Sequence, residues 1–434
     1  MIPSRWLIFL IFAWGLVGLV VSILGQPPLI WAGTGVAVGG LALLDLLLVL
    51  AQRPLLIRRK PASRFALGVA GEVELEIVNR GLTKARVEIF DGLPADAESD
   101  EMPWQGTAPR RGFTEVNYSV KMMKRGLLQF TAAHLRRISP FGLWRHTMLC
   151  GESSDVRVYP NYEPIVRYSL LALENQENIM GIVHRNRPGM SRDFHQLREY
   201  QEGDLLSQID WNASSKRLQL ISREYREQRD QSIIIMVDCG HRMRAYDGDL
   251  PQFDHCLNAV LLTSFIALRQ GDKVGVLGFG GANRWQPPVK GQHSMTTLLN
   301  HLYDYQTTKE PSDYTEAVEQ LMVRQRRRAL VIVLTNLRSE DSGDVLLALR
   351  LLQRRHVVML ASLREASVQK SVTRRIEGFD DALQFGATHL YLEERARLFE
   401  ELRGHGILTL DETAKELPVA LSNSYLDIKN SGRL

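Results

Sequence analysis

Three short polar segments in the second half of the chain carry side chains that could hold a divalent cation or contact a partner protein. They read Asp238-Cys239-Gly240-His241-Arg242, Ser312-Asp313-Tyr314-Thr315 and Thr335-Asn336-Leu337. Carboxylate, hydroxyl and amide oxygens are donors that suit a hard cation such as Mg²⁺. In an open α/β sheet ligands bind beyond the carboxyl ends of the strands, so we expect these segments to share one edge of a sheet.

The elements that must position these segments alternate between strands and helices. Apolar runs predict buried parallel strands at 232–237, 274–279, 329–334, 356–361 and 406–410, with an edge strand around Trp285. Helical patterns lie at 252–270, 293–307, 313–327, 343–355 and 380–403. This series predicts a doubly wound α/β domain over residues 231–411, followed by a C-terminal tail at 412–434.

The polar segments resemble the metal-binding face of the von Willebrand factor A domain. That family carries Asp-x-Ser-x-Ser after its first strand, a Thr in a second loop and an Asp after a later strand. Here Asp238 stands at the first position and Thr315 matches the Thr. Gly240 and Arg242 occupy the serine positions, and Asn336 replaces the later carboxylate.

These departures remove two hydroxyls and one negative charge, and they place a cation where the metal should sit. We therefore expect the face to bind a partner protein, and we expect no cofactor. Asp238 would then pair with Arg242 or cap a neighbouring loop. The alternative is a Mg²⁺-dependent binding module that uses Asp238 and Thr315. The predicted partner-binding face consists of Asp238, Gly240, Arg242, Asp313, Thr315 and Asn336.

The segment that precedes the first of these strands is the most specific feature of the chain. It reads Arg198-Glu199-Tyr200-Gln201-Glu202-Gly203-Asp204, then Ile209-Asp210-Trp211, then Arg223-Glu224-Tyr225. From the residues alone, Glu199, Asp204 and Asp210 are either acid/base groups of a hydrolase or members of an ion-pair network with neighbouring Arg and Lys. Trp211 reads as a buried aromatic beside a carboxylate.

This segment resembles the signature of the bacterial family called domain of unknown function 58, and Phe141-Gly142-Leu143 and Val158-Tyr159-Pro160 match turns typical of that family. The matching signature residues are Arg198, Glu199, Tyr200, Gly203, Asp204, Asp210, Trp211, Arg223 and Glu224. The resemblance implies a membrane hairpin, a β-rich region and a von Willebrand factor A-like domain in succession. It also implies a MoxR-type AAA+ ATPase as partner, in protein maturation or remodelling at the cell envelope. The chain has no Walker A loop, so the partner would supply the energy.

Two apolar runs near the N-terminus, Trp6 to Leu24 and Leu29 to Val49, are each long enough to cross a bilayer as a helix. We therefore predict a transmembrane hairpin over residues 1–52 of a multi-pass protein of the cell inner membrane. Arg5 precedes the hairpin and basic residues follow it from Arg53, which predicts that the N-terminus and the main domains are cytoplasmic. Asp45 interrupts the second run. It is either functional, or it faces the partner helix or lies near the cytoplasmic end.

Between the hairpin and the α/β domain, alternation with period two over residues 61–160 predicts a small β-sandwich. Residues 161–230 form a connector that holds the signature. The net charge of +4 gives no argument for nucleic acid. The three cysteines, Cys150, Cys239 and Cys256, have no metal-binding spacing, and we interpret them as reduced thiols. The sequence thus favours a membrane-anchored binding protein over an enzyme.

Overall fold

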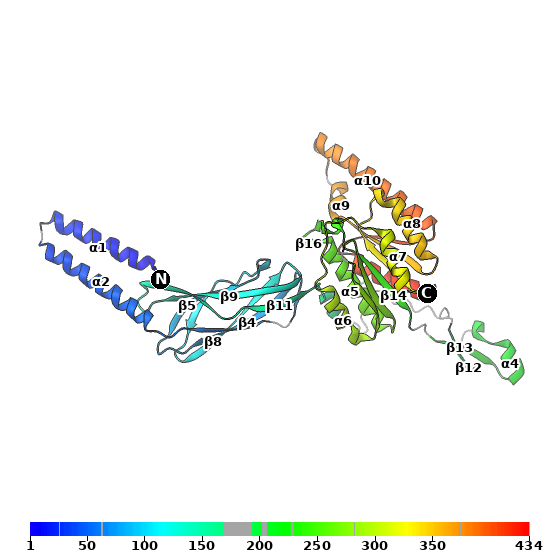
Figure 1. Ribbon diagram of the computed structural model, residues 1–434, viewed down its shortest axis with the longest axis horizontal. Coiled ribbons are helices and arrows are strands. Elements are labelled where there is room, and N and C mark those ends of the chain that lie inside the picture. Colours follow the sequence, from blue (N-terminus) through cyan, green and yellow to red (C-terminus); the bar gives the residue numbers. More distant parts are fainter. Residues whose placement is uncertain are drawn as a thin grey trace. The chain divides into compact units, whose positions relative to one another are not determined.

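The computed structural model describes residues 1–25, 27–61, 64–167, 193–201, 206–226, 230–281, 283–373 and 375–433 (Figure 1). Contacts divide the chain into two compact units, Met1–Tyr159 and Pro160–Leu434. Much of the predicted connector lies outside the described residues, at 168–192, 202–205 and 227–229. The signature residues Gly203 and Asp204 are among those not described.

The first unit begins with two apolar helices, α1 (Arg5–Ile23) and α2 (Pro28–Leu50). Both are long and apolar enough to cross a membrane. They pack through Trp14 and Trp31, whose stacked rings have centroids 4.7 Å apart. Gly35 permits this approach, because a Cβ at that position would lie 2.8 Å from the Trp14 ring. The two helices lie where the apolar runs predict them.

The remainder of the first unit consists of two β-sheets. The four-stranded sheet has the order β2-β4-β8-β6, and in the seven-stranded sheet β1, β10, β9, β11 and β3 follow one another while β5 pairs with β9 and β7. Buried Val73, Leu75 and Ile77 alternate with glutamates along β4, as the period of two predicts. The strands are β1 (Ile2–Pro3), β2 (Leu56–Pro61), β3 (Phe65–Ala66), β4 (Ala70–Asn79), β5 (Ala85–Gly92), β6 (Ala97–Glu98), β7 (Trp104–Ala108), β8 (Gly112–Met122), β9 (Gly126–Ile138), β10 (Trp144–Cys150) and β11 (Ser154–Tyr159).

A buried carboxylate, Asp91 on β5, connects the two sheets. It accepts hydrogen bonds from the Nε of Arg59 on β2, at 2.9 Å, and from the hydroxyl of Tyr118 on β8. Burial, together with the neighbouring Asp91 carboxylate, raises the pKa of the Tyr118 hydroxyl. Since a buried charge is tolerated only when it is paired and hydrogen-bonded, this cluster fixes how the two sheets face each other.

A second buried carboxylate, Asp45 on α2, binds the turn between β9 and β10. It accepts hydrogen bonds from the Ser139 hydroxyl and from the backbone N–H groups of Phe141, at 3.0 Å, and Leu143, at 3.1 Å. The Trp144 indole N–H donates to the carbonyl of Ala42 on the same helix, at 2.8 Å. Asp45 therefore lies near the carboxyl end of α2, and its hydrogen-bond partner is the Ser139–Leu143 turn rather than α1.

The second unit is built on a mixed six-stranded sheet of order β18-β17-β14-β19-β20-β21, in which only β18 is antiparallel to its neighbour. Side chains that alternate along β14 enter two separate apolar clusters, one on each face of the sheet. The strands lie where the apolar runs predict them. They are β14 (Ser232–Asp238), β17 (Lys273–Phe279), β18 (Trp285–Lys290), β19 (Leu330–Thr335), β20 (Val357–Arg364) and β21 (Leu408–Thr413).

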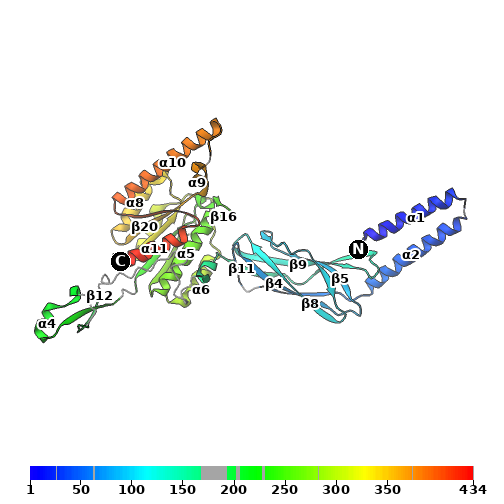
Figure 2. The ribbon, with the colours of Figure 1, turned by 180° about the vertical axis from the view of Figure 1, so that it is seen from behind.

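Helices cover both faces of this sheet (Figures 1 and 2). The cluster on one face includes residues of α5 (Gln252–Arg269), α6 (Met295–Leu302) and α11 (Leu417–Asn430). The cluster on the other face includes residues of α7 (Tyr314–Arg324), α8 (Ser342–Gln353) and α10 (Phe379–Gly404). Two short strands, β15 (Tyr246–Asp247) and β16 (Leu250–Pro251), precede α5, and the short helix α9 (Ala366–Thr373) follows β20.

The segment 412–434, expected to be a C-terminal tail, contains a core helix instead. Leu417, Leu421 and Tyr425 recur at intervals of four, so they fall on one side of α11 and are buried against α5. The Tyr425 hydroxyl also donates to Asp272, at 2.5 Å, and the Lys429 ammonium lies 2.8 Å from the same carboxylate. An apolar stripe combined with this buried ion pair makes the helix part of the sheet's covering layer.

Asp45→Ala should loosen the junction between α2 and the β9–β10 turn. It leaves three donors without their charged acceptor, and we expect a loss of about 3 kcal/mol of stability. A lower melting temperature of the detergent-solubilised full chain, with faster trypsin cleavage at Arg145, would report this loss. Asp96→Ala is the control, because Asp96 forms only an exposed ion pair with Lys124. Equal behaviour of the two variants would show that the Asp45 contacts contribute nothing.

Candidate functional site

The candidate site lies where the strand order of the six-stranded sheet reverses. From β14 the chain first adds β17 on one side and later adds β19 on the other. Such a reversal leaves a crevice beyond the carboxyl ends of the two strands, and ligands of open α/β sheets bind there. Asp238 ends β14 and Thr335 ends β19, so both side chains reach this point.

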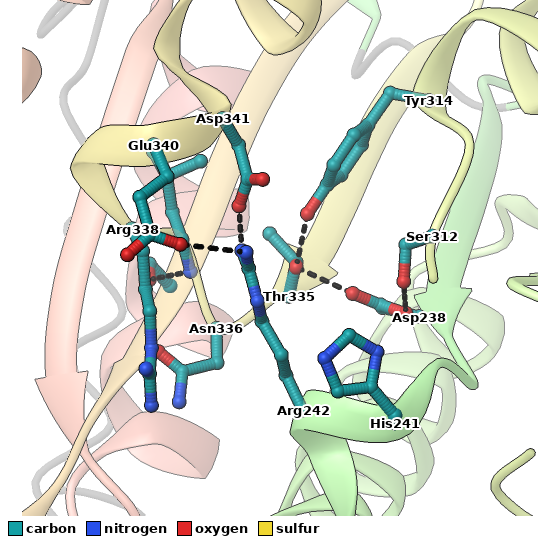
Figure 3. A network of polar contacts seen from close by, with 12 residues as sticks. Asp238, His241, Arg242, Ser312, Tyr314, Thr335, Asn336, Arg338, Glu340 and Asp341 are labelled. Carbon is teal, nitrogen blue, oxygen red and sulfur yellow. Dashed lines mark hydrogen bonds and ion pairs between the residues drawn. The ribbon is translucent and has the colours of Figure 1, made fainter. Parts of the chain in front are cut away.

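Asp238 is buried and fully hydrogen-bonded (Figure 3). Its Oδ1 accepts from the Ser312 hydroxyl and from the Gly240 N–H, at 2.8 Å, while its Oδ2 accepts from the Thr335 hydroxyl, at 2.6 Å. The Tyr314 hydroxyl lies 2.8 Å from that of Thr335 and extends the network. Burial raises the pKa of Asp238 and the three donors oppose that rise. The carboxylate therefore holds its own loop through Gly240 and a neighbouring loop through Ser312, and the second of these contacts is the loop-capping role expected for it.

The absence of a side chain at Gly240 permits this arrangement. A Cβ there would lie 2.1 Å from the Ser312 hydroxyl oxygen. The loop that carries Ser312 is held against the strand ends by backbone bonds, from Thr308 N to Cys239 O at 2.7 Å and from His241 N to Glu310 O at 3.0 Å. The hydroxyl missing at position 240 is thus supplied to Asp238 by Ser312, from a different loop.

Arg242 does not pair with Asp238. Its guanidinium forms ion pairs with Glu340, at 3.3 Å, and with Asp341, both in the loop after β19 (Figure 3). Glu340 is largely exposed, whereas Arg242 and Asp341 are about one-fifth exposed. Because these charges have opposite sign and partly face solvent, they form a polar rim that a partner protein can contact.

The other predicted face residues lie on the same edge but perform different tasks. Asp313 caps the N-terminus of α7 by accepting from Glu316 N, at 2.9 Å. Thr315 is exposed in the first turn of that helix. The Asn336 amide is buried and donates to Gln252, at 2.9 Å, and to Glu365, at 3.0 Å. Neither Thr315 nor Asn336 is among the hydrogen-bonding partners of Asp238.

These side chains do not fit a divalent cation. Both carboxylate oxygens of Asp238 already accept from protein donors, and the nearby cation Arg242 would repel a metal. Among the described residues, no group of three or more His, Cys, Asp or Glu side chains could hold a metal ion. A Mg²⁺ ion that bound a carboxylate oxygen of Asp238 would therefore compete with hydrogen-bond donors that are already in place.

Helix α10 lies beside this edge and extends the surface. Arg395 anchors its carboxyl half, because the buried guanidinium donates to Leu337 O after β19, to the Ser362 hydroxyl on β20 and to Asp411 on β21. The amino half carries the exposed apolar side chains Phe379, Leu383 and Leu390, of which Phe379 is 82% exposed. Large exposed apolar side chains beside a polar rim are typical of protein-interaction surfaces.

The described part of the signature forms a two-stranded hairpin with its own short helix. β12 (Asp193–Glu199) pairs antiparallel with β13 (Ile221–Arg226), and α4 (Trp211–Arg217) lies between them in sequence. Asp210 caps α4 by accepting from Ala213 N, at 3.0 Å, and pairs with Arg223 at 2.9 Å. These contacts lower the pKa of Asp210. Asp210 therefore belongs to an ion pair, as one of its two interpretations expects.

Trp211 corrects an expectation, because it is 67% exposed rather than buried. It is the first residue of α4, and Leu206 and Leu218 in the same segment are exposed too. Arg198 and Glu199 end β12, and the N–H of Tyr200, which follows, donates to Leu220 O at 2.9 Å. Glu224 pairs with Gln196 across the hairpin. The described signature residues therefore build a hairpin with an exposed apolar tip.

Sequence reasoning missed Ser312, Thr335 and Arg395, which hold the edge together. Ser312 and Thr335 each lie within one of the polar segments, so the segments were found but the contacting hydroxyls were not. The burial of Arg395 is harder to predict, because a single arginine within an ordinary helical pattern is usually exposed. None of the three cysteines, all of which the structure describes, forms a disulfide, and Cys239 and Cys256 are buried.

Comparisons with known proteins give one family match. A family model described as "Protein of unknown function DUF58" matches residues 196–377. An uncharacterized protein of Bacillus subtilis, YeaD, is 22% identical over 257 residues, which cover 59% of this chain. The chain spans 60% of the length of that relative.

The solved structures that partly resemble this chain have low TM-scores and low sequence identity to it. The C-terminal part of Escherichia coli alpha-2-macroglobulin has a TM-score of 0.22 and 14% identity, over 25% of this chain and 17% of that one. The proximal thread matrix protein 1 of the mussel byssus has a TM-score of 0.26 and 10% identity, over 47% of this chain and 46% of that one. At these scores the likenesses carry no argument about fold or function.

Asp238→Ala should destabilise the second unit, whereas Thr315→Ala should not. The first change leaves two hydroxyls and one N–H without their acceptor, at a cost of about 3 kcal/mol, and the second alters an exposed side chain. Added Mg²⁺ should shift the melting temperature of neither variant nor of the wild type. A Mg²⁺-dependent stabilisation that Asp238→Ala and Thr315→Ala both abolish would establish the metal site instead.

Proposed function

Because the chain belongs to the DUF58 family, we propose that it is a membrane-anchored adaptor that binds a partner protein rather than an enzyme. The α1–α2 hairpin anchors it in the cell inner membrane, with the N-terminus, the β-sheets of the first unit and the second unit on the cytoplasmic side. The second unit is a von Willebrand factor A-like domain, and the two sheets of the first unit form a β-sandwich. The partner is a MoxR-type AAA+ ATPase that matures or remodels client proteins at the cell envelope.

The anchor is supported by the length and composition of α1 and α2. Arg5 is the first residue of α1, and Arg53, Arg58, Arg59 and Lys60 follow α2. Such basic flanks favour the cytoplasmic side. The von Willebrand factor A-like assignment is supported by a parallel sheet with one antiparallel edge strand, helices on both faces, and an Asp at the end of β14.

One combined observation supports the binding role. At the carboxyl edge of the sheet Asp238 is hydrogen-bonded within the protein, and helix α10 carries exposed apolar side chains. Both carboxylate oxygens of Asp238 accept hydrogen bonds from neighbouring protein groups, so Asp238 is poorly placed as a base or nucleophile. Next to it lie the paired charges of Arg242, Glu340 and Asp341, and the exposed Phe379 and Leu383 lie farther out, in the first turns of α10. Charged rims and exposed apolar side chains are both features that protein partners bind.

The direct test measures binding between the full chain in nanodiscs and the purified MoxR-type ATPase of the same host. Phe379→Asp combined with Leu383→Asp should weaken the affinity about tenfold or more, because two exposed anchor side chains are lost. Val323→Asp is the control. The exposed fraction of Val323 lies between those of Phe379 and Leu383, and Val323 lies on another helix, near the carboxyl end of α7. No binding by the wild type, or equal loss in the control, would reject the proposed role.

A further inference from the structure

Three turns of the first unit gather at the end of the β-sheets that adjoins α2. The 79–84 turn lies there because Leu56, six residues after the end of α2, pairs with Val78. The 109–112 turn joins it, since Arg111 N donates to Gly81 O at 3.2 Å. The 139–143 turn is held by Asp45 itself. If α2 spans a bilayer, all three turns lie at its surface.

The three turns and their flanks are uniformly basic. Residues 79–86, 108–114 and 136–146 contain eight Lys and Arg residues and no Asp or Glu. Arg80, Lys84, Arg110 and Arg111 are exposed. Arg53 and Arg58 follow the end of α2, whereas Arg59 and Lys60 are already paired with Asp91 and Glu74. Such a concentration of cations attracts an anionic surface or anionic headgroups.

A pocket of about 390 Å³ lies among these residues. Arg53, Arg58, Arg80 and Arg111 line it together with the apolar side chains of Leu56 and Phe113. Glu76 is the one acidic side chain among its lining residues, and it lies 3.9 Å from Arg58. Neither Arg80 nor Arg111 forms an ion pair within the part of the chain that the structure describes. The pocket thus combines excess positive charge with an apolar wall.

A buried arginine next to this pocket lacks a counter-anion. Arg137 is 2% exposed, and its Nη1 donates to the carbonyl of Arg53 at 3.1 Å. Its Nε and Nη2 have no hydrogen-bond partner among the described residues. A Cβ on Gly81 would come within 4.0 Å of Nη2, which places the guanidinium beside the 79–84 turn. Burial lowers the pKa of Arg137, and an anion bound nearby would offset that cost.

The same three turns each present a large apolar side chain to solvent. Leu82, Phe113 and Phe141 are all more than half exposed. An isolated exposed apolar residue needs no explanation, but three of them alternate here with arginines at one end of the unit. Aromatic and aliphatic side chains beside cations are typical of segments that lie in the boundary between headgroups and acyl chains.

We propose that this end of the first unit binds the phosphate of an anionic phospholipid headgroup in the pocket formed by Arg53, Arg80 and Arg111. Leu82, Phe113 and Phe141 enter the acyl boundary around it. The inference rests on the proposed membrane anchor and adds a lipid ligand to it. The hairpin alone would tolerate any bilayer, whereas this pocket makes the chain selective for anionic lipid.

The test uses the full chain in detergent, titrated with short-chain phosphatidylglycerol, short-chain phosphatidylcholine or inorganic phosphate, with melting temperature as the readout. Phosphatidylglycerol should stabilise the protein saturably, and the other two should not. Arg80→Gln combined with Arg111→Gln should weaken the apparent affinity about tenfold or more, since each cation at a membrane surface contributes about fivefold. Both side chains are exposed, so the melting temperature without lipid should not change.

Arg326→Gln combined with Arg327→Gln is the matched control, because it removes two exposed arginines from a basic run in the second unit. Equal loss in the control would mean nonspecific charge attraction and would overturn the proposal. Equal stabilisation by phosphatidylcholine, or stabilisation by inorganic phosphate alone, would also overturn it. Should Arg111→Gln fail to fold, Arg53→Gln combined with Arg80→Gln gives the same comparison.

Alkaline carbonate extraction separates this inference from the proposed function. Wild type and variants should all remain in the membrane pellet, because the hairpin and not the pocket holds them there. Release of the wild type would reject the anchor itself. Retention of the wild type without preference for phosphatidylglycerol would reject the lipid pocket alone.

Discussion

The contact between Asp45 and the Ser139–Leu143 turn determines how the first unit is put together. A carboxylate inside an apolar helix is costly unless donors surround it, and this one receives three from a single turn. Only a short segment separates α2 from β2, so the turn and the helix end are fixed together. One consequence is that the basic turns must lie at the helix end. Another is that the N-terminal strand β1 reaches β10 next to the same turn, where Ser4 N donates to Leu143 O at 2.8 Å.

In the second unit, too, buried charged groups are held by several hydrogen bonds, here at the edge where the parallel strands of the sheet end. Asp238 collects donors from three segments, and Arg395 collects acceptors from the ends of three adjacent strands. Each group is buried, so removing any partner would leave an uncompensated charge or polar atom. These two residues therefore fix loops and helix α10 that would otherwise be free to move. The result is a preformed surface, and under the proposed function it would lower the ordering cost of binding a partner.

The sequence predicts the fold well where the hydrophobic pattern of a segment by itself indicates its secondary structure. Buried strands such as 232–238 are continuous apolar runs, and α1 and α2 are apolar throughout, so neither required knowledge of distant contacts. The helix at 417–430 was missed because its short apolar stripe follows a strand that ends later than expected, at Thr413. The prediction for Trp211 is wrong because burial of an aromatic depends on what packs against it, and Trp211 begins a seven-residue helix whose neighbour is the hairpin strand β13. In both cases the outcome depends on packing between segments that are distant in the sequence.

The candidate edge shows the same limit more sharply. Its location follows from strand order, but which hydroxyl reaches Asp238 depends on helical phase. Thr315 lies one residue inside α7 and points to solvent, whereas Ser312 precedes the cap at Asp313 and reaches the carboxylate. Gly240 can therefore replace a serine without loss of a donor, because the donor arrives from another loop and needs the space. A position that looks degenerate against a family pattern is here a compensated one. Compensation of this kind preserves the shape of the edge, because Ser312 donates to Asp238 from the space that a side chain at position 240 would fill.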